Sequence, residues 1–600
     1  MQWEPQRRAD DPLQPVWDWL GRHWQAVLVI CWLLLCAWML SERAGAIRGF
    51  ALPDTDDNLR MAQVRAWLAG QDWFDLRQMK LNPPGGFNIH WSRIVDLPIA
   101  ALILGLRPFI GGAMAEKAAV AIAPMLPLLL AMFSLALAAR RLVAPGAWLL
   151  AAALLPFAHG TMGMFRPLRI DHHGWQLALL ALTIAALADP RRGRGGMVVG
   201  IASAVSLAIG LELLPYIAVA GASIVLRWVV HADARPRMLA YALSFGLATI
   251  IAYVVFASYA NRQPLCDALT PVWLTTVAVA CLAVAAIGIA PAETWRGRLL
   301  FAGFAGAATL AFFWFAWPGC HGRPEGVSPE LYRLWLGNVR EAKPLFAQDW
   351  PLFTGLSVLP ALGLGGAAYC LWRARGTETV YPWLSVIVMS LFSVAMLVWQ
   401  VRAGPASQLI GLFGCAGMVW TLVLRARAST RLLVRVIVPA GLLCAVPAAS
   451  LVGALPIYPK SRPGPLRAKI NRASRLCPTL AALAPIGRLP ATTIFTFVDL
   501  GPRLITVTHH KAIAGPYHRN GDAILDVHHA FDGTPERARA IIRAHGATHL
   551  LVCPYLPEST VYKARSPKGF YARLERGERF DWLEPVTLPA KSPYWLWRLR

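Results

Sequence analysis

Residues 169–189 read RIDHHGWQLALLALTIAALAD, a polar cluster followed directly by an apolar segment. Apolar runs of about 18–22 residues recur along the first three quarters of the chain, and this length crosses the hydrocarbon core of a membrane. Of the 600 residues, 56% are hydrophobic and only 15% are charged, whereas soluble proteins carry nearer a quarter charged residues. The sequence therefore predicts a mainly α-helical, polytopic membrane protein.

The apolar runs predict about thirteen membrane-spanning helices. They lie at residues 25–40, 115–139, 147–165, 175–189, 197–213, 215–230, 238–258, 271–290, 299–317, 351–372, 380–399, 406–424 and 432–450. The first resembles a signal-anchor, because it lacks a small-x-small cleavage site. Leu97–Ile110 is apolar but short, so we expect an interfacial or re-entrant piece there.

Arginines decide the expected topology, because the cytoplasmic loops of membrane proteins are enriched in Lys and Arg. With a cytoplasmic N-terminus, every inner loop carries at least two arginines, and acidic residues fall in the outer loops. The inner arginines are Arg140, Arg141, Arg191, Arg192, Arg194, Arg235, Arg237, Arg296, Arg298, Arg373, Arg375, Arg425, Arg427 and Arg431. The net charge of +25 therefore reflects topology. We expect no nucleic-acid partner, since no basic stripe interleaved with aromatics is present.

The chain divides into three parts. Residues 1–24 form an expected cytoplasmic segment, residues 25–454 the transmembrane domain and residues 455–600 an extracytoplasmic domain of mixed α/β structure. The last boundary is placed where long apolar runs stop and prolines and charges rise. The outer loops that carry polar clusters are 41–96, 166–174 and 318–350.

Local patterns predict some structure outside the spans. In the first outer loop, Leu59–Leu76 is amphipathic, so we expect a helix lying in the membrane interface. In the C-terminal domain, Thr534–His545 has helical periodicity and Thr534 as a capping residue. Alternating or β-branched runs predict strands at Thr492–Val498, Leu504–Thr508, His549–Val552 and Tyr594–Leu599.

The ten cysteines are scattered without a CxxC pair. Those inside apolar runs are most simply small core residues. Four lie outside the runs, in regions that we place in an oxidising compartment: Cys266, Cys320, Cys477 and Cys553. The sequence allows a disulfide among them but does not fix the pairing.

Two acidic clusters each follow an outward-going span directly: Asp54-Thr55-Asp56-Asp57 and Asp171-His172-His173. Alone, the first is equally well explained as a helix cap, because Asp is favoured at that position. The second alone has a plain explanation as polar residues at headgroup level. Together they favour a metal site with Asp54, Asp171 and His173 as ligands, and these oxygen and nitrogen donors suit Mn²⁺ or Mg²⁺.

Two further residues stand out in the later outer loops. Glu341 is a lone glutamate in an aromatic and basic segment, and taken alone it reads as a surface residue paired with Arg340 or Lys343. Arg402 lies at the outer end of the eleventh span. Its side chain either reaches to lipid headgroups or forms a fork for a phosphate oxygen.

In this order and on these loops, the four pieces resemble the catalytic subunit of oligosaccharyltransferases, within the GT-C class of glycosyltransferases. The first outer loop of that family carries a motif that begins with Asp-Pro and ends in Arg six residues after the Asp. Asp54 and Arg60 have this spacing, and Asn58 also matches the eukaryotic form. The resemblance covers roughly residues 20–450.

The later motifs match in part. Asp171-His172-His173 is similar to the Asp-His-His of archaeal members, with Gln176 where the family often has Glu. Val339-Arg340-Glu341 is similar to a family motif that ends in Glu. The C-terminal motif Trp-Trp-Asp-Tyr-Gly, which reads the Ser/Thr of an acceptor sequon, is represented by residues 496–501, TFVDLG. Asp499 and the glycine remain, but the aromatics are gone.

The resemblance implies thirteen membrane helices, a C-terminal extracytoplasmic domain and a place in the bacterial inner membrane, with that domain in the periplasm. It implies transfer of a sugar or oligosaccharide from a polyprenyl (di)phosphate at the outer face. The implied roles are metal binding by Asp54, Asp171 and His173, acceptor activation by Asp54 or Asp56, donor phosphate binding by Arg402 and Arg60, and acceptor binding by Glu341 and Asp499.

Two alternatives stay open. Loss of the sequon-reading aromatics favours a lipid-linked glycan or polysaccharide acceptor about as strongly as the family favours protein. A transporter of lipid-linked substrates is the third hypothesis, but transporters place polar residues near the midplane of the membrane. Here the spans are nearly free of acidic residues, which cluster at one face.

Overall fold

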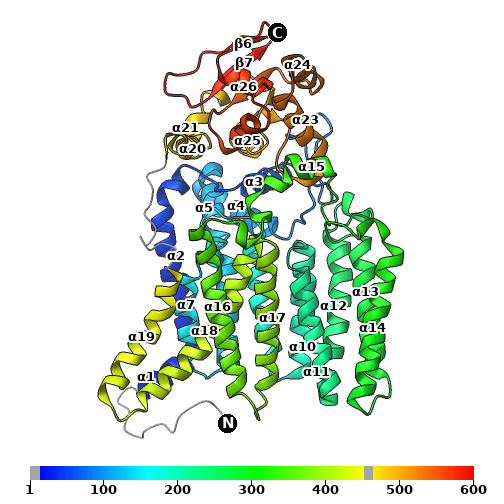
Figure 1. Cartoon of the computed structure of the whole chain (residues 1–600), viewed down its shortest axis with the longest axis vertical. Helices are drawn as coiled ribbons and strands as arrows, with labels where there is room; N and C mark the ends of the chain where they lie inside the picture. Colours follow the sequence, from blue (N-terminus) through cyan, green and yellow to red (C-terminus); the bar gives the residue numbers. More distant parts are fainter. Residues whose placement is uncertain (1–13, 452–463) are drawn as a thin grey trace.

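The computed structural model describes residues 14–451 and 464–600. A bundle of long helices forms the lower part of the molecule, and a small α/β domain lies above it (Figure 1). The bundle contains α1 (Gln14–Arg22), α2 (Trp24–Arg48), α5 (Gly112–Ile122), α6 (Met125–Leu142), α7 (Trp148–Leu154), α8 (His159–Gly163), α9 (His173–Leu187), α10 (Arg192–Ile209), α11 (Leu214–Val230), α12 (Arg235–Phe256), α13 (Pro271–Ile289), α14 (Trp295–Ala316), α16 (Trp350–Arg373), α17 (Val380–Trp399), α18 (Gly404–Arg427) and α19 (Leu432–Ser450).

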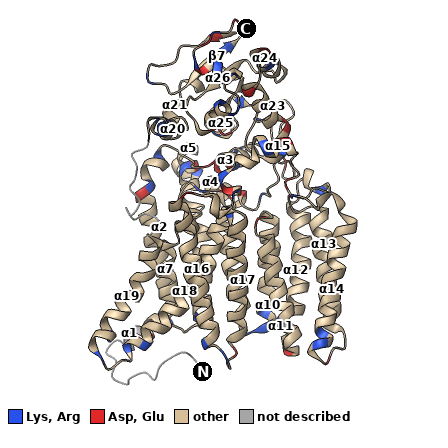
Figure 2. Ribbon diagram, viewed as in Figure 1, with Lys and Arg blue, Asp and Glu red and all other residues tan. Residues whose placement is uncertain are grey.

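The bundle confirms an integral membrane protein. Within the described ranges, nine helical segments are long and apolar enough to cross a membrane. Three further apolar helices are shorter: Trp148–Phe157, His173–Leu187 and Leu214–Val230. Charged side chains gather at the two ends of the bundle and in the domain above it (Figure 2). Helices occupy every predicted span, and the number of crossings, thirteen, stays a prediction.

Glycines bring α16 and α18 into close contact. A Cβ on Gly363 would collide with the backbone of Gly411, and a Cβ on Gly414 would collide with the backbone of Gly363. Small residues at such an interface let two membrane helices pack backbone to backbone. This packing fixes α18, whose first turn directly follows Arg402.

Short elements lie between the bundle and the upper domain. They are α3 (Thr55–Leu68), β1 (Arg77–Gln78), β2 (Phe87–Asn88), α4 (Asp96–Ile110) and α15 (Pro329–Leu334). The upper domain contains α20 (Pro465–Leu476), α21 (Leu480–Leu483), β3 (Thr493–Phe495), α22 (Gly501–Val507), β4 (Lys511–Ala512), α23 (Gly521–Asp532), α24 (Pro535–Ala544), β5 (His549–Val552), α25 (Pro557–Arg565), α26 (Phe570–Glu575), β6 (Leu583–Pro585) and β7 (Trp595–Leu599).

The C-terminal domain is built on a mixed five-stranded sheet in the order β4-β3-β5-β7-β6. Strands β4, β3 and β5 pair in parallel, whereas β7 is antiparallel to both β5 and β6. The predicted strands at Thr492–Val498, His549–Val552 and Tyr594–Leu599 are therefore confirmed. The predicted helix at Thr534–His545 is also confirmed, since the Thr534 side chain accepts a hydrogen bond from the backbone N–H of Arg537 and caps α24.

The strand predicted at Leu504–Thr508 is wrong, because these residues lie in and just after helix α22. Proline at the start of this helix suits the first turn. Residues 501–506 are all buried, so the helix has no polar face. A short run that is buried on all sides shows no periodicity that would separate helix from strand.

The first outer loop is part of the C-terminal domain's core. Leu59, Leu81, Phe87 and Trp91 belong to the same cluster of buried apolar side chains as the central strands. The predicted interfacial helix at Leu59–Leu76 is therefore wrong in length and in place: α3 ends at Leu68 and packs against α22. Amphipathic periodicity reports an apolar face, but not whether lipid or protein covers it. Residues of the first outer loop between Leu59 and Trp91 therefore contribute to the core of the C-terminal domain.

Two disulfides join the four cysteines that lie outside the apolar runs. One links Cys266 to Cys320, between the loops that follow α12 and α14. The other links Cys477 to Cys553 inside the C-terminal domain. The expected disulfide chemistry is confirmed, with a pairing that the sequence left open.

Candidate active site

The candidate active site lies where α3, the loop before α9 and the C-terminal domain meet. Asp54 is the N-cap of α3 and accepts a hydrogen bond from the backbone N–H of Thr55. The Tyr517 hydroxyl, from the C-terminal domain, donates to the carbonyl of Thr55 at 2.8 Å. From α22, Arg503 donates to the side-chain oxygen of Asn58. The C-terminal domain therefore holds the start of α3 in place.

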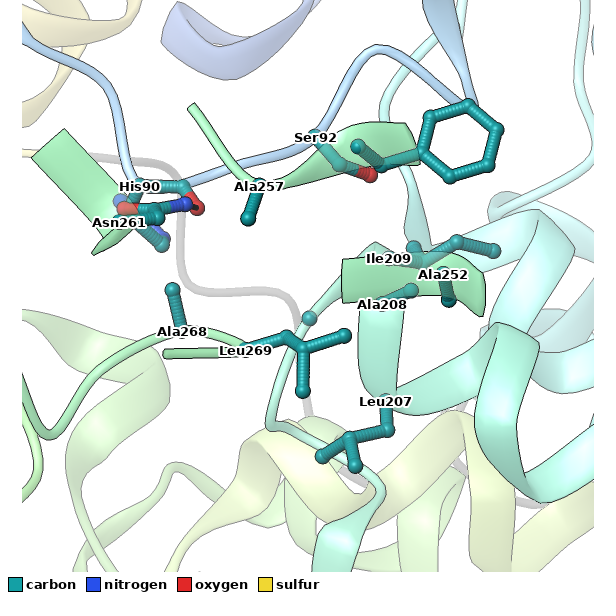
Figure 3. Close-up of a pocket in the computed structure, with 12 residues that line it drawn as sticks. His90, Ser92, Leu207, Ala208, Ile209, Ala252, Ala257, Asn261, Ala268 and Leu269 are labelled. Atoms are coloured by element: carbon teal, nitrogen blue, oxygen red, sulfur yellow. Dashed lines mark hydrogen bonds between the residues drawn. The ribbon is translucent and has the colours of Figure 1, made fainter. Parts of the chain in front are cut away.

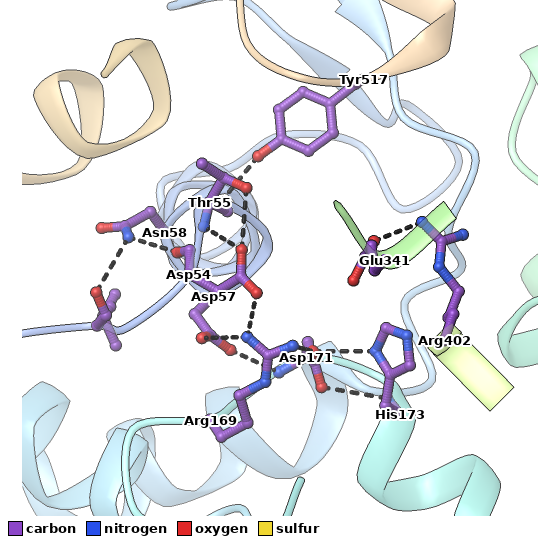
Figure 4. A network of polar contacts seen from close by, with 11 residues as sticks. Asp54, Thr55, Asp57, Asn58, Arg169, Asp171, His173, Glu341, Arg402 and Tyr517 are labelled. Carbon is purple, nitrogen blue, oxygen red and sulfur yellow. Dashed lines mark hydrogen bonds and ion pairs between the residues drawn. The ribbon is translucent and has the colours of Figure 1, made fainter. Parts of the chain in front are cut away.

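Arg169 is the centre of the site (Figure 4). Its Nη1 lies 2.5 Å from the Oδ2 of Asp54 and 3.2 Å from the Oδ2 of Asp57, and its Nη2 lies 2.6 Å from the Oδ2 of Asp171. The carboxylates of Asp57 and Asp171 are fully buried. One guanidinium thus neutralises carboxylates from two loops that are more than a hundred residues apart.

The second acidic cluster is held by hydrogen bonds on every side. The backbone N–H of Asp171 donates to the Oδ1 of Asp57, and the Nδ1 of His173 lies 3.0 Å from the Oδ2 of Asp171. The Nε2 of His172 lies 2.8 Å from Glu212, which also accepts a hydrogen bond from Gln176. Gln176 is therefore linked to His172 through a glutamate from the loop after α10.

The charges in this pocket shift the pKa values of its acids in opposite directions. Burial acts to raise the pKa of Asp54, but the charge and hydrogen bond of Arg169 outweigh it and hold the pKa below the usual range. Burial is also outweighed at Asp171, by Arg169 and His173, and its pKa is low. At Asp57, burial prevails over Arg169 and the pKa is raised. The pocket holds more acidic groups than Arg169 can neutralise.

Asp56 is the acid without a counter-charge. Burial, followed by the charges of Asp54 and Asp171, raises the pKa of Asp56 to about 7. Asp56 forms no ion pair with any residue in the described ranges. A buried carboxyl group with a raised pKa carries a proton near neutral pH unless a nearby cation stabilises its ionised form.

Glu341 and Arg402 form an ion pair at 2.5 Å. Figure 4 shows this pair across from His173. The alternative that pairs Glu341 with Arg340 is wrong, because Arg340 contacts Asp349 instead. The charges of Glu212 and Asp56 also act on Arg402, after that of Glu341. Arg402 therefore lies in the electric field of the site's carboxylates.

Arg60 does not lie at this site as the family spacing predicted. Its side chain and that of Asp96 are each 2% exposed, and they form an ion pair at 2.7 Å. The Arg60 guanidinium also lies over the ring of Trp91, 4.8 Å from its centroid. A buried, paired guanidinium cannot reach a lipid phosphate, so the prediction of donor binding by Arg60 is corrected to a structural role that joins α3 to the start of α4.

Asp499 projects from the C-terminal domain on the loop after β3. Its backbone N–H and that of Val498 donate to the carboxyl group of Glu558. The Asp499 side chain is exposed by surface area, yet the protein around it desolvates the carboxyl group. This effect and the charge of Asp54 raise the pKa of Asp499 to about 6. The acid predicted to contact the acceptor thus lies within electrostatic reach of Asp54.

A hollow of about 220 Å³ opens beside Arg169 and Asp171. Apolar side chains of the bundle line the rest of it, among them Ile99, Met164 and Trp175. The hollow therefore has a charged end beside the acidic cluster and an apolar wall within the bundle.

The predicted metal ligands Asp54, Asp171 and His173 lie together, but not as a preformed cation site, because Arg169 stands between the two carboxylates. Within the described ranges, the group of His, Asp, Glu or Cys side chains with ligand atoms within 4.8 Å of one another is His90, Asp267 and His518. These three residues lie at a different place from the predicted ligands.

Sequence reasoning missed three residues at the active site. Asp57 and Arg169 belong to the quoted clusters, but their spacing in the sequence does not predict that Arg169 forms ion pairs with three carboxylates. Glu212 lies in a later outer loop, where its charge alone did not single it out. An acid at the outer end of a span, two crossings after the Asp-His-His cluster, was the available signal.

No protein-family model and no curated protein matches this sequence. Solved structures do match. The archaeal oligosaccharyltransferase AglB from Archaeoglobus fulgidus, in complex with an inhibitory peptide and a dolichol-phosphate, gives a TM-score of 0.67 at 13% identity over 92% of this chain and 72% of that chain. An A. fulgidus oligosaccharyltransferase tethered to an acceptor peptide with the NVT sequon gives 0.64 at 13% identity over the same shares. A complex of that enzyme with zinc and sulfate gives 0.58 at 14% identity, over 86% and 66%. The chain therefore has the GT-C fold of the archaeal oligosaccharyltransferases.

Proposed function

We propose that this protein is a glycosyltransferase that moves a sugar or oligosaccharide from a polyprenyl (di)phosphate to an acceptor at the outer face of the membrane. The observation that carries the proposal is the meeting of Asp54, Asp56 and Asp171 with His173 at one pocket above the bundle, in a fold shared with oligosaccharyltransferases. Distant acids collected at a membrane surface, beside a cavity with an apolar wall, are arranged for a charged lipid substrate.

The orientation follows from the same features. Arginine-rich loops at the end of the bundle away from the site favour a cytoplasmic N-terminus. Both disulfides lie on the side of the C-terminal domain, and disulfides persist in oxidising compartments. We therefore assign the site and the C-terminal domain to the periplasmic side of a bacterial inner membrane.

The donor phosphate would lie beside Arg169 and Arg402. The hollow next to Arg169 would take the first part of the isoprenoid chain. Arg402, with one buried guanidinium nitrogen that has no partner, offers a further hydrogen bond to a phosphate oxygen. A guanidinium fork is well suited to that contact.

Mn²⁺ or Mg²⁺ fits the chemistry of the donor set, because Asp54, Asp171 and His173 offer oxygen and nitrogen ligands. The neighbouring Asp56, which forms no ion pair with any described residue, is the observation in favour, since a nearby cation would stabilise its ionised form. When bound, the metal would stabilise negative charge on the departing phosphate. Arg169 would have to move away from Asp54 or Asp171 to admit it.

The chain's own acids would act on the acceptor. Asp56, with a pKa of about 7, is suited to accept the proton of the attacking group, because a general base works best near the operating pH. Asp54 would orient the same group. Glu341, on an exposed outer loop and tied to Arg402, would contact the acceptor from the opposite side.

A glycan acceptor is the second candidate, supported by the segment that replaces the sequon-reading motif. Phe497 and Val498 are buried in the core of the C-terminal domain, where Phe497 packs against Phe531 and Tyr571. They present no aromatic surface to a peptide. Asp499 is the one side chain of the three that faces outward.

The acceptor is decided by following a radiolabelled lipid-linked sugar in membranes that contain the protein. Label that enters protein supports a peptide acceptor, and label that enters glycolipid or polysaccharide supports a glycan acceptor. Label that stays on the donor in both fractions, with folded protein present, contradicts glycosyl transfer. Movement of intact donor across the membrane under the same conditions would favour transport.

Removal of divalent cations should stop the reaction. We expect a chelator to lower transfer by about 100-fold or more, because a Lewis acid contributes several kcal/mol to stabilising a developing phosphate charge. Excess Mn²⁺ or Mg²⁺ should restore the rate, and a pre-formed chelator–Mg²⁺ complex is the matched control. Undiminished transfer in chelator would remove the metal from this proposal and leave Arg169 as the cation at the site.

Arg402→Gln should raise the KM for the lipid-linked donor about 10-fold, because a charge-assisted hydrogen bond contributes roughly 1.5–3 kcal/mol. The measurement is a donor titration in detergent with saturating acceptor. Arg340→Gln is the control, since Arg340 pairs with Asp349 on an exposed part of the loop that carries Glu341. An unchanged donor KM in Arg402→Gln would assign Arg402 to positioning Glu341 alone.

A further inference from the structure

Three side chains from distant parts of the sequence meet beside the active site without belonging to it. His90 follows β2 in the first outer loop, Asp267 lies between α12 and α13, and His518 lies in the C-terminal domain. The Nε2 of His518 is 2.5 Å from the Oδ2 of Asp267. The imidazole rings of His90 and His518 are 4.6 Å apart between centroids. Their ligand atoms all fall within 4.8 Å of one another.

The carboxylate of this cluster is held in position from behind. Arg519 donates two hydrogen bonds of 2.7 Å, one to each oxygen of Asp267. The preceding residue, Cys266, is tied by its disulfide to Cys320. Metal-binding carboxylates are typically oriented by such outer hydrogen bonds. Asp267 is therefore fixed before any ligand arrives.

A buried polar atom lies next to the cluster and has no partner. Asn261 is 3% exposed, its Nδ2 donates to the backbone carbonyl of His90, and its Oδ1 has no hydrogen-bond partner among the described residues. Both residues line a cavity of about 270 Å³ whose other walls are mostly apolar. Figure 3 shows them together at one side of that cavity. An orphaned acceptor there suits a water molecule held by a cation.

We propose that His90, Asp267 and His518 bind a divalent transition metal, Zn²⁺ by the chemistry of the set, with a water as fourth ligand next to Asn261. Two imidazoles and a carboxylate form a common three-residue zinc set. In a tetrahedral site with metal–ligand distances of about 2.0–2.2 Å, the ligand atoms lie about 3.3–3.5 Å apart. The Nε2 of His518 and the Oδ2 of Asp267, now 2.5 Å apart, must therefore separate by about 0.8–1.0 Å.

The zinc site is distinct from the glycosyl-transfer site. The ring of Trp91 stands between them, with its centroid 5.3 Å from the ring of His90 and 5.3 Å from that of His172. The bound ion joins the first outer loop, the bundle and the C-terminal domain at one point. Its role is therefore structural: it cross-links these three parts of the chain.

The test measures zinc in the full-length protein purified in detergent, stripped with a chelator and re-equilibrated with ZnCl₂. To silence the proposed catalytic metal, every sample carries Asp171→Asn with His173→Gln. We expect one tightly held zinc per chain. Adding His90→Gln and His518→Gln should remove it. His529→Gln with His545→Gln, which changes histidines paired to acids near the surface, should leave it in place.

Two outcomes would overturn the proposal. One is the absence of stoichiometric zinc in the starting variant, and the other is zinc content unaffected by the His90 and His518 changes. A second measurement does not depend on those variants folding. Cobalt loaded into the starting variant should give the visible absorption of a four-coordinate ion, and Zn²⁺ should raise its melting temperature. A six-coordinate cobalt spectrum without a shift in melting would refute the site.

Discussion

Asp171→Asn abolishes sugar transfer while the protein still inserts and folds. Asp171 is fully buried, receives Arg169 and His173 on one oxygen, and is positioned by Asp57 through its own backbone N–H. The amide keeps the shape of the side chain but loses the charge that the contacts with Arg169 and His173 need. We expect a loss of about 100-fold or more, the scale seen when one preorganised electrostatic contact is removed from an active site.

The measurement compares transfer from a labelled lipid-linked sugar at equal amounts of detergent-purified protein, with gel filtration as the test of folding. Asp75→Asn is the matched control, because Asp75 lies in the same outer loop as Asp54 but pairs with Arg77 at the surface. The control should retain full activity. Near-normal transfer by folded Asp171→Asn protein would end the assignment of this pocket as the active site.

Arg169→Gln should destabilise the protein more than any other single change at the site. The variant leaves Asp54, Asp57 and Asp171 together without their shared cation, and breaking a buried ion pair from one side costs about 3–5 kcal/mol. The pKa values of these acids would then rise above their unfolded values. In wild type the low pKa values of Asp54 and Asp171 stabilise the fold above the unfolded Asp pKa. The deficit of the variant should therefore be smaller near pH 3 (roughly one unit below the unfolded Asp value) and should grow as pH rises toward 8.

Thermal unfolding of wild type and variant across that pH range is the measurement. Arg77→Gln removes an arginine whose side chain is 51% exposed and should leave stability unchanged at every pH, because surface ion pairs contribute little. A deficit in Arg169→Gln that does not vary with pH would show that Arg169 contributes through packing and not through charge.

The sequence predicted the membrane helices well, because apolar length is a local property and arginine pairs mark alternate loops. It also predicted that Asp54, Asp171 and His173 would lie at one face. Topology alone placed them there, and the structure adds that they surround Arg169. Even the capping role of Asp54, which was offered as an alternative, is present alongside its contact with Arg169.

The wrong predictions share one physical cause: each depends on a contact between residues that lie far apart in the sequence. Arg60 has the spacing of a family motif, yet its guanidinium forms a buried ion pair with Asp96. The cluster of His90, Asp267 and His518 joins three segments whose proximity depends on how the C-terminal domain docks. Leu504–Thr508 has no local pattern to reveal a helix that is buried on all sides. No window of sequence contains this information.

The shared core of the first outer loop and the C-terminal domain limits how this protein can be engineered. Leu59, Leu81 and Phe87 are packed among the side chains of the C-terminal sheet, and Tyr517 holds Thr55 beside the essential acids. A chimaera that exchanges only the last 140 or so residues (about one domain) would therefore combine a first outer loop and a C-terminal domain whose apolar side chains do not pack together. To graft a new acceptor preference, the segment from Thr55 to Trp91 must be transplanted together with the tail.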